Sequence, residues 1–175
     1  FAMTAASASP DYSAGPSVAV GERLAVLVDT QSLCTAARYV LHSKLDYRRL
    51  IAGMIKGRQL CRAVGYGVEG MAAEDSALQE LKNCEFELRI KKSKRPEQES
   101  ARSAGAWEVG LTVEALALAA KVDTLVLATC NEDFAPLVER LKRMCRVEVV
   151  SIDTAGSEAL VNAADRFIRI PQECF

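Results

Sequence analysis

Short apolar runs alternate with helical patterns along most of this chain, and that alternation restricts its fold more than any other feature. The stretch RLAVLVD (23–29) is apolar between its two charged ends, as expected for a strand buried on both faces of a sheet. Helical spacing follows over 31–42 and 46–56, and the same order recurs to the C-terminus. The other predicted strands are 59–68, 86–92, 123–129, 146–152 and 166–170, and the other predicted helices are 73–83, 106–120, 133–145 and 157–164. This alternation predicts an α/β fold, a three-layer αβα sandwich with a central, mainly parallel sheet.

The composition places these elements in one domain. The 175 residues are 50% hydrophobic and 26% charged, which is enough apolar material for a single core. We expect residues 1–21, rich in Ala, Ser, Gly and Pro, to form a flexible arm, and residues 22–175 to form the domain. The six cysteines are scattered and form no CxxC pair, which favours a reducing compartment. We see no membrane-length apolar run and no signal peptide, and we therefore expect a cytoplasmic protein.

Any catalytic chemistry in this chain must rest on carboxylates. His42 is the only histidine, which nearly excludes zinc sites built on several histidines and a histidine general base. In parallel α/β sheets, ligands bind beyond the carboxyl ends of the strands. Three acids and an amide are candidates for such a site: Asp29, Glu108, Asn131 and Asp133. Carboxylates that converge there repel one another unless their pKa values shift or they bind a hard cation such as Mg²⁺ or Mn²⁺.

Helix capping is a simpler explanation for the same acids. Asp29 and Asp133 each lie at the start of a predicted helix, and Asp is a favoured N-cap residue. Glu108 gains from the dipole of its helix whatever its function. Pro136 has no N–H to donate to Asp133, which weakens the capping interpretation there without removing it. Capping and metal binding are therefore both open for these residues.

Four stretches of the chain resemble motifs of the NYN domains, a family of the PIN-like nuclease superfamily that includes the bacterial LabA-like branch. They are VDTQSL (28–33), GAWEVGLTVEAL (105–116), VDTLVLATCNEDFAPLVERL (122–141) and SEALVNAADRFI (157–168). In this order they are similar to the family's DxxN motif after the first strand, its KGVDV segment, its SGDxDF motif with the following P-L-V helix, and its closing S-x-x-L, A-D and F-I pattern. The resemblance covers roughly residues 23–170.

The resemblance implies a PIN-like sandwich and, in the active members of the family, a Mg²⁺- or Mn²⁺-dependent ribonuclease with an acidic pocket. Asp29 matches the first catalytic Asp of the family, and Asp133 matches the second Asp of SGDxDF. Glu108 stands where KGVDV has Asp, Asn131 where SGDxDF has its first Asp, and Gln31 where DxxN has Asn. We therefore expect Asp29, Glu108, Asp133 and Asn131 in the catalytic site, with the three acids as metal ligands.

Several residues near the acidic positions are predicted to bind the substrate. Gln31 and Thr129 lie close to them in sequence, and the basic stretch 89–95 runs into the loop ahead of the helix at 106–120. The predicted substrate-binding residues are Gln31, Thr129, Lys92, Lys94 and Arg95. Because the whole chain has a net charge of −1, RNA affinity must come from such local patches. A second basic stretch, 44–62, is interpreted mainly as a solvated face.

The leading hypothesis is a divalent-metal-dependent ribonuclease that hydrolyses the phosphodiester bonds of RNA. The alternative is a catalytically degenerate PIN-like domain that binds RNA or a protein partner as a scaffold, because Asn131 removes one negative charge from the site. A third hypothesis is a homodimer formed through the helix at 106–120, which is rich in Ala and Leu.

Overall fold

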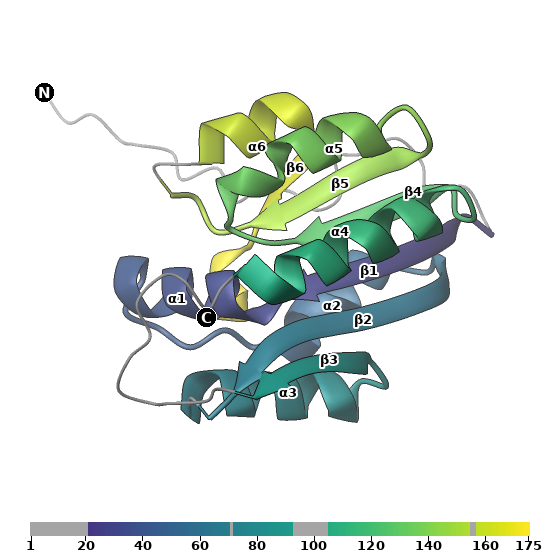
Figure 1. Ribbon diagram of the computed structural model, residues 1–175. Coiled ribbons are helices and arrows are strands. Elements are labelled where there is room, and N and C mark those ends of the chain that lie inside the picture. Colours follow the sequence, from purple (N-terminus) through teal and green to yellow (C-terminus); the bar gives the residue numbers. More distant parts are fainter. Residues whose placement is uncertain (1–20, 71, 93–104, 155–156) are drawn as a thin grey trace, which may run out of the picture.

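Six parallel strands form the centre of the molecule. The computed structural model describes residues 21–70, 72–92, 105–154 and 157–175. The sheet order is β3-β2-β1-β4-β5-β6, and every neighbouring pair is parallel (Figure 1). The strands are β1 (Arg23–Asp29), β2 (Gln59–Glu69), β3 (Glu87–Lys92), β4 (Thr124–Ala128), β5 (Arg146–Ser151) and β6 (Arg166–Arg169). The predicted parallel α/β sandwich is confirmed, whereas the predicted arm at 1–21 lies outside the described residues except for its last position.

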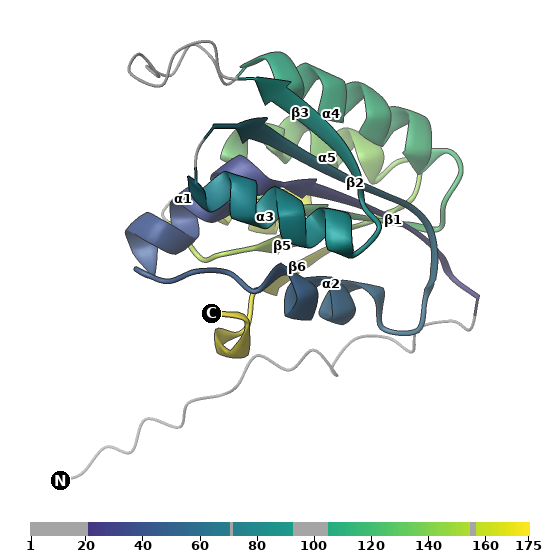
Figure 2. The same ribbon diagram turned by 90° about the horizontal axis from the view of Figure 1, so that it is seen from below.

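Helices cover both faces of this sheet (Figures 1 and 2). One face carries α1 (Thr30–Val40), α2 (Tyr47–Ile55) and α3 (Ala72–Asn83), and the other carries α4 (Gly105–Ala119), α5 (Ala135–Leu141) and α6 (Ser157–Ala163). Two short 3-10 helices are η1 (Glu132–Phe134) and η2 (Gln172–Cys174). Within the described part of the chain, no helix has both the length and the apolar character of a membrane span.

The side chains of β1 alternate between two hydrophobic cores. Leu24, Val26 and Val28 pack beneath α1, α2 and α3, whereas Ala25 and Leu27 pack beneath α4, α5 and α6. All five are fully buried. Because both faces of the strand are covered, neither set of alternate positions tolerates polar residues, which explains the continuous apolar run.

Two helices differ from their predicted extents by more than one residue at an end. The helix predicted over 133–145 is the 3-10 turn η1 followed by the shorter α5, with Pro136 in the first turn of α5, where a missing N–H costs little. The helix predicted over 31–42 is α1, which ends at Val40, and Val40 and Leu41 are 49% and 39% exposed. They lie at the C-terminal end of α1, beyond the edge of the core.

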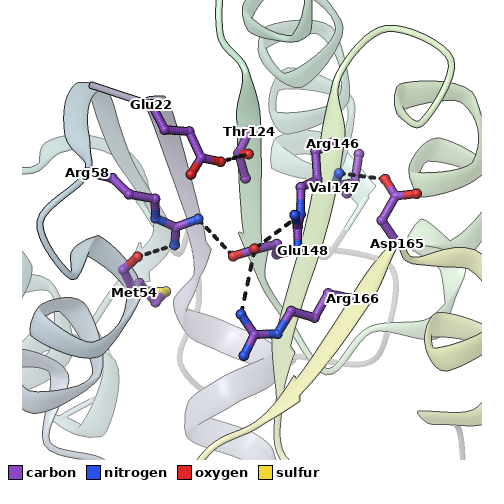
Figure 3. A network of polar contacts seen from close by, with 9 residues as sticks. All are labelled: Glu22, Met54, Arg58, Thr124, Arg146, Val147, Glu148, Asp165 and Arg166. Carbon is purple, nitrogen blue, oxygen red and sulfur yellow. Dashed lines mark hydrogen bonds and ion pairs between the residues drawn. The ribbon is translucent and has the colours of Figure 1, made fainter. Parts of the chain in front are cut away.

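A buried ion cluster lies near the amino ends of the strands (Figure 3). The carboxylate of Glu148 on β5 is 3.0 Å from Nη1 of Arg58, 3.5 Å from Nε of Arg146 and 3.9 Å from Nη1 of Arg166. The side chains of Glu148 and Arg58 are only 3% and 6% exposed. Arg58 also donates a hydrogen bond to the backbone carbonyl of Met54. The cluster ties the turn before β2 to the opposite half of the sheet.

The basic stretch 44–62 is therefore not simply a solvated face. Its ion pairs join Lys44 to Glu80, Arg49 to Asp46, Arg58 to Glu148, and Arg62 to both Glu87 and Glu114. The interpretation suits Lys44 and Arg49, whose side chains are 67% and 64% exposed, but it is wrong for Arg58. Because these cations already have acidic partners, they are a weak candidate for an RNA-binding patch.

Candidate active site

The candidate site lies where β1 and β4 end side by side in the middle of the sheet. The chain leaves β1 into α1 on one face and leaves β4 into η1 and α5 on the other. Such a reversal opens a crevice at the carboxyl ends of parallel strands, which is the usual ligand position in open α/β sheets. Asp29 lies on one side of this crevice, and the segment 129–133 lies on the other.

Asp29 ends β1 and caps α1. Its Oδ1 accepts a hydrogen bond from the backbone N–H of Ser32 at 3.1 Å, and its Oδ2 accepts one from Oγ1 of Thr129 at 2.8 Å. Asp29 is fully buried, and this burial raises its pKa; the hydrogen bonds from Ser32 and Thr129 act in the opposite direction, and the charge of Glu108 adds to the increase. No cationic side chain of the described residues pairs with it. Asp29 thus caps α1, as the capping interpretation predicts. Capping does not explain why a buried carboxyl without a cationic partner lies at this edge of the sheet.

Two hydroxyl groups connect the ends of β1 and β4. Oγ1 of Thr129 donates to Asp29 and accepts a hydrogen bond from the backbone N–H of Asn131 at 3.0 Å. Oγ of Ser32 lies 3.2 Å from Oγ1 of Thr129 and accepts from the backbone N–H of Cys130 at 2.9 Å. Through its hydrogen bond to Oδ2, Thr129 positions Asp29. Thr129 is fully buried, so the prediction that it contacts the substrate is wrong. Ser32 was missed from the sequence, although a hydroxyl in the first turn after a strand-end Asp was a usable signal.

Asn131 joins the segment after β4 to the first turn of α4. Its Nδ2 donates to Oε1 of Glu108 at 3.0 Å, and its Oδ1 accepts from the backbone N–H of Asp133 at 3.0 Å. The backbone donor fixes the orientation of the amide, so that its NH₂ group faces Glu108. An Asp at this position would instead bring two carboxylates to hydrogen-bonding distance.

Glu108 and Asn131 border two open pockets. The first, of about 420 Å³, contains Asp29, and the second, of about 520 Å³, contains Asp133 among apolar side chains of α4 and α5. Asp133 is exposed and does not line the Asp29 pocket. No group of three or more His, Cys, Asp or Glu side chains in the described ranges could hold a metal ion. The predicted set of three carboxylates is therefore not assembled here, but Asp29 and Glu108 share one pocket.

Comparison with known families agrees with this architecture. The family model of the NYN domain matches residues 23–171, which is most of the chain. The chain belongs to the NYN domain family. This membership places it in the PIN-like nuclease superfamily and confirms the resemblance seen in the sequence motifs.

A solved structure has a similar fold. The NYN domain is 26% identical to a protein of unknown function from Vibrio parahaemolyticus, with a TM-score of 0.77, and the match covers 90% of this chain and 98% of the other. A polyketide synthase domain also aligns, at 18% identity over 89% of this chain and 70% of the other, but its TM-score of 0.36 is too low to support any inference. A search of curated proteins finds no match.

PIN-like nucleases generally depend on a divalent metal ion. In this NYN domain, carboxylate oxygens are available for a metal site that needs few protein ligands. Mg²⁺ is usually held by one or two carboxylates together with water and substrate phosphate. Asp29 and Glu108 supply two carboxylates to one pocket. Each oxygen of Asp29 retains a second lone pair beyond the hydrogen bond that it accepts. The two acids therefore fit a hard divalent ion.

The remaining predicted substrate-binding residues lie in different surroundings. Gln31 lines the Asp29 pocket. Lys92 is exposed at the end of β3, two strands from β1 in the sheet order, which is about 10 Å by the spacing of strands. Lys94 and Arg95 lie outside the described residues.

Trp107 and Glu114 flank the site on α4. Trp107 is 7% exposed and packs in the core under α4, yet it lines the Asp29 pocket, and its Nε1 has no hydrogen-bond partner in the described structure. Glu114 accepts a hydrogen bond from the hydroxyl of Tyr66 and forms ion pairs with Arg62 at 3.1 Å and Arg89 at 3.7 Å. Its carboxylate is thus occupied away from Asp29, as its helical spacing from Glu108 predicts.

Proposed function

We propose that this NYN domain is a divalent-metal-dependent ribonuclease that hydrolyses RNA phosphodiester bonds at the Asp29 pocket. One observation carries the proposal: a fully buried carboxyl that lacks a cationic partner in the described residues shares a pocket with Glu108 at the crevice between β1 and β4. NYN domains generally bind RNA, which supports RNA as the substrate.

Electrostatics explain why this pocket favours a cation. Burial and the nearby charge of Glu108 both favour the protonated form of Asp29. A divalent ion between the two carboxylates would reverse both effects, because one charge pair at 4 Å is worth about 4 kcal/mol at the effective dielectric constant of a protein surface. The ion would therefore stabilise the ionised form of Asp29 that the apo site disfavours.

The residues of this chain would prepare the pocket for in-line hydrolysis. Bound at the two carboxylates, the ion would polarise a non-bridging phosphate oxygen and lower the pKa of a bound water. Thr129 and the N–H of Ser32 hold Asp29 in one orientation, and Asn131 does the same for Glu108. Gln31, which lines the pocket, would donate to the phosphate.

A specific observation also favours a second function, an RNA-binding domain that does not cleave. The amide of Asn131 donates to Glu108 at 3.0 Å and so already supplies part of the stabilisation that a cation would give to that carboxylate. The lack of a three-carboxylate group in the described residues points the same way. In this case the domain would bind RNA with weak or no metal dependence.

The test is cleavage of single-stranded and structured RNA by the purified native chain in Mn²⁺, in Mg²⁺ and in EDTA. We expect cleavage in either metal and none in EDTA or with the Asp29→Asn variant. The matched control is Asp123→Asn, which makes the same change at an exposed carboxylate at the amino end of β4. Cleavage that persists in EDTA or in Asp29→Asn would falsify the proposal.

Calorimetric titration with Mn²⁺ separates the two functions. A ribonuclease of this kind should bind Mn²⁺ in the native chain and in Asp123→Asn, but not in Asp29→Asn. RNA binding without cleavage and without heat from Mn²⁺ would instead identify the non-cleaving domain.

A further inference from the structure

Helix α4 has an apolar outer face, although that face is exposed to solvent. Glu108 and Glu114 are the only charged residues along its 15 residues. Leu111 is fully buried against the core, but Val109 and Val113 on the outer side are 64% and 62% exposed. A helix that is apolar on all sides is normally covered on all sides. The exposed valines therefore indicate a surface that is covered in the functional protein.

These valines border the α4–α5 groove, the pocket of about 520 Å³ between these two helices. Its other walls are mostly apolar and include Leu116, Phe134 and Leu137. The shape and composition are those of a groove that receives apolar side chains and not of a pocket for a phosphate.

Charged side chains lie only at the two ends of this groove. Glu108 and Asp133 lie where α4 and η1 begin, and Arg140 lies in the last turn of α5. Asp133 in η1 and Arg140 in α5 are separated along the chain by nearly the full length of α5. Both are exposed, and neither forms a side-chain ion pair or hydrogen bond in the described part of the chain.

An apolar groove with unpaired opposite charges at its ends is complementary to itself under two-fold rotation. We propose that this NYN domain forms a homodimer through the α4–α5 groove. Val109 and Val113 of each copy pack into the groove of the other, and Asp133 pairs with the partner's Arg140 at both ends. The occupant is a second copy because the same groove supplies both the acid and the base that the contact needs.

The dimer would also complete the rim of the candidate active site. Glu108 and Asn131 border both the groove and the Asp29 pocket. The partner's Arg140, paired with Asp133, would therefore place a guanidinium at the end of the groove that carries Glu108 and Asn131, next to a pocket whose own described rim is acidic. The association is independent of the proposed function, because it is measured by mass and not by cleavage.

Sedimentation velocity over a concentration series tests the association directly. We expect a native species with about twice the chain mass of 19.0 kDa. Val113→Glu should raise the dissociation constant at least tenfold, roughly, because it buries a charge in the apolar contact. The matched control is Val161→Glu on α6, a valine that is 38% exposed and does not line the groove; it should leave the dissociation constant unchanged.

A charge exchange tests the geometry without relying on an apolar substitution. Asp133→Arg and Arg140→Asp should each weaken the dimer, and the double variant should restore it, which a misfolded protein would not do. Arg143→Asp, outside the groove, is the control for Arg140→Asp. A native chain that stays monomeric at every concentration would overturn the proposal, as would a dimer that Val113→Glu and both single charge variants leave intact.

Discussion

Two buried carboxylates at opposite ends of the same sheet have opposite surroundings. Asp29, at the carboxyl end of β1, is fully buried, and the side chain of Glu148, near the amino end of β5, is only 3% exposed. Glu148 is paired with Arg58 and two further arginines. Asp29 instead receives hydrogen bonds from neutral groups of Ser32 and Thr129. Burial is the same at both sites, but the source of charge compensation differs.

That difference separates a structural acid from a candidate metal ligand. Removing a carboxylate from water is costly, and internal cations offset the cost at Glu148. At Asp29 the neutral donors offset only part of it, and the pKa of the carboxyl is raised. The missing compensation must come from a proton or from a bound cation, which is the property expected of a metal ligand.

The largest predicted effect is loss of stability on removing the acid of the ion cluster. Glu148→Gln leaves the nearly buried Arg58 without a carboxylate, which should lower the free energy of unfolding by about 3–5 kcal/mol. Asp29→Asn should cost about 1 kcal/mol or less, because an amide retains the oxygen that caps α1. Urea denaturation of both variants in EDTA measures the contrast. Equal losses would mean that Asp29 is as structural as Glu148.

A smaller effect is expected from making the candidate site more acidic. Asn131→Asp replaces the hydrogen bond to Glu108 by a like-charge contact, which should cost about 2–3 kcal/mol in EDTA. The added carboxylate should tighten Mn²⁺ binding about tenfold or more and increase cleavage. Asn162→Asp, on the exposed surface of α6, is the matched control. Weaker Mn²⁺ binding by Asn131→Asp would show that residue 131 lies outside the metal site.

The sequence predicted the fold well because its strongest signals are local. The run at 23–29 is apolar at consecutive positions, so it predicts a strand buried on both faces, and the alternation with helices predicts parallel pairing. The position of Asp29 opposite the segment after β4 follows from the same reasoning, because equivalent ends of parallel strands meet at one edge. Local pattern and sheet geometry together were sufficient to bring the ends of β1 and β4, which carry the candidate site, side by side.

The contacts within the site depend on rotations that no local pattern specifies. Glu108 reaches Asn131 only because α4 presents that side of its first turn to the sheet edge. Asp133 lies in a 3-10 turn, whose residues are spaced about 120° apart and not 100° as in the predicted α-helix, and it does not line the Asp29 pocket. Arg58 and Glu148 pair although they lie ninety positions apart, and two opposite charges are no local signal for that contact.

The pH dependence of stability should distinguish Asp29 from an ordinary surface acid. Because its pKa in the folded state is raised from 3.8, the folded protein retains a proton that the unfolded chain has lost. The resulting stability is complete below pH 3.8 and is lost as the pH rises through the folded pKa. In EDTA, the native chain should therefore lose stability relative to Asp29→Asn over this window, and Mn²⁺ should restore it at higher pH. A difference that does not vary with pH would contradict the raised pKa.

The last predicted effect, also a small one, should come from the hydroxyl that supports Asp29. Thr129→Val keeps the shape of the side chain but removes the donor to Oδ2 of Asp29 and the acceptor for the N–H of Asn131, at a cost of about 1–2 kcal/mol. Because that hydrogen bond lowers the pKa of Asp29, its loss should raise the pKa further and move the pH-dependent loss of stability to higher pH. Thr129→Ser retains the hydroxyl and should behave like the native chain. The contrary outcome is that Thr129→Val lowers the free energy of unfolding without changing its pH dependence. In that case the hydroxyl supports only the backbone after β4, and the cap of α1 alone orients Asp29.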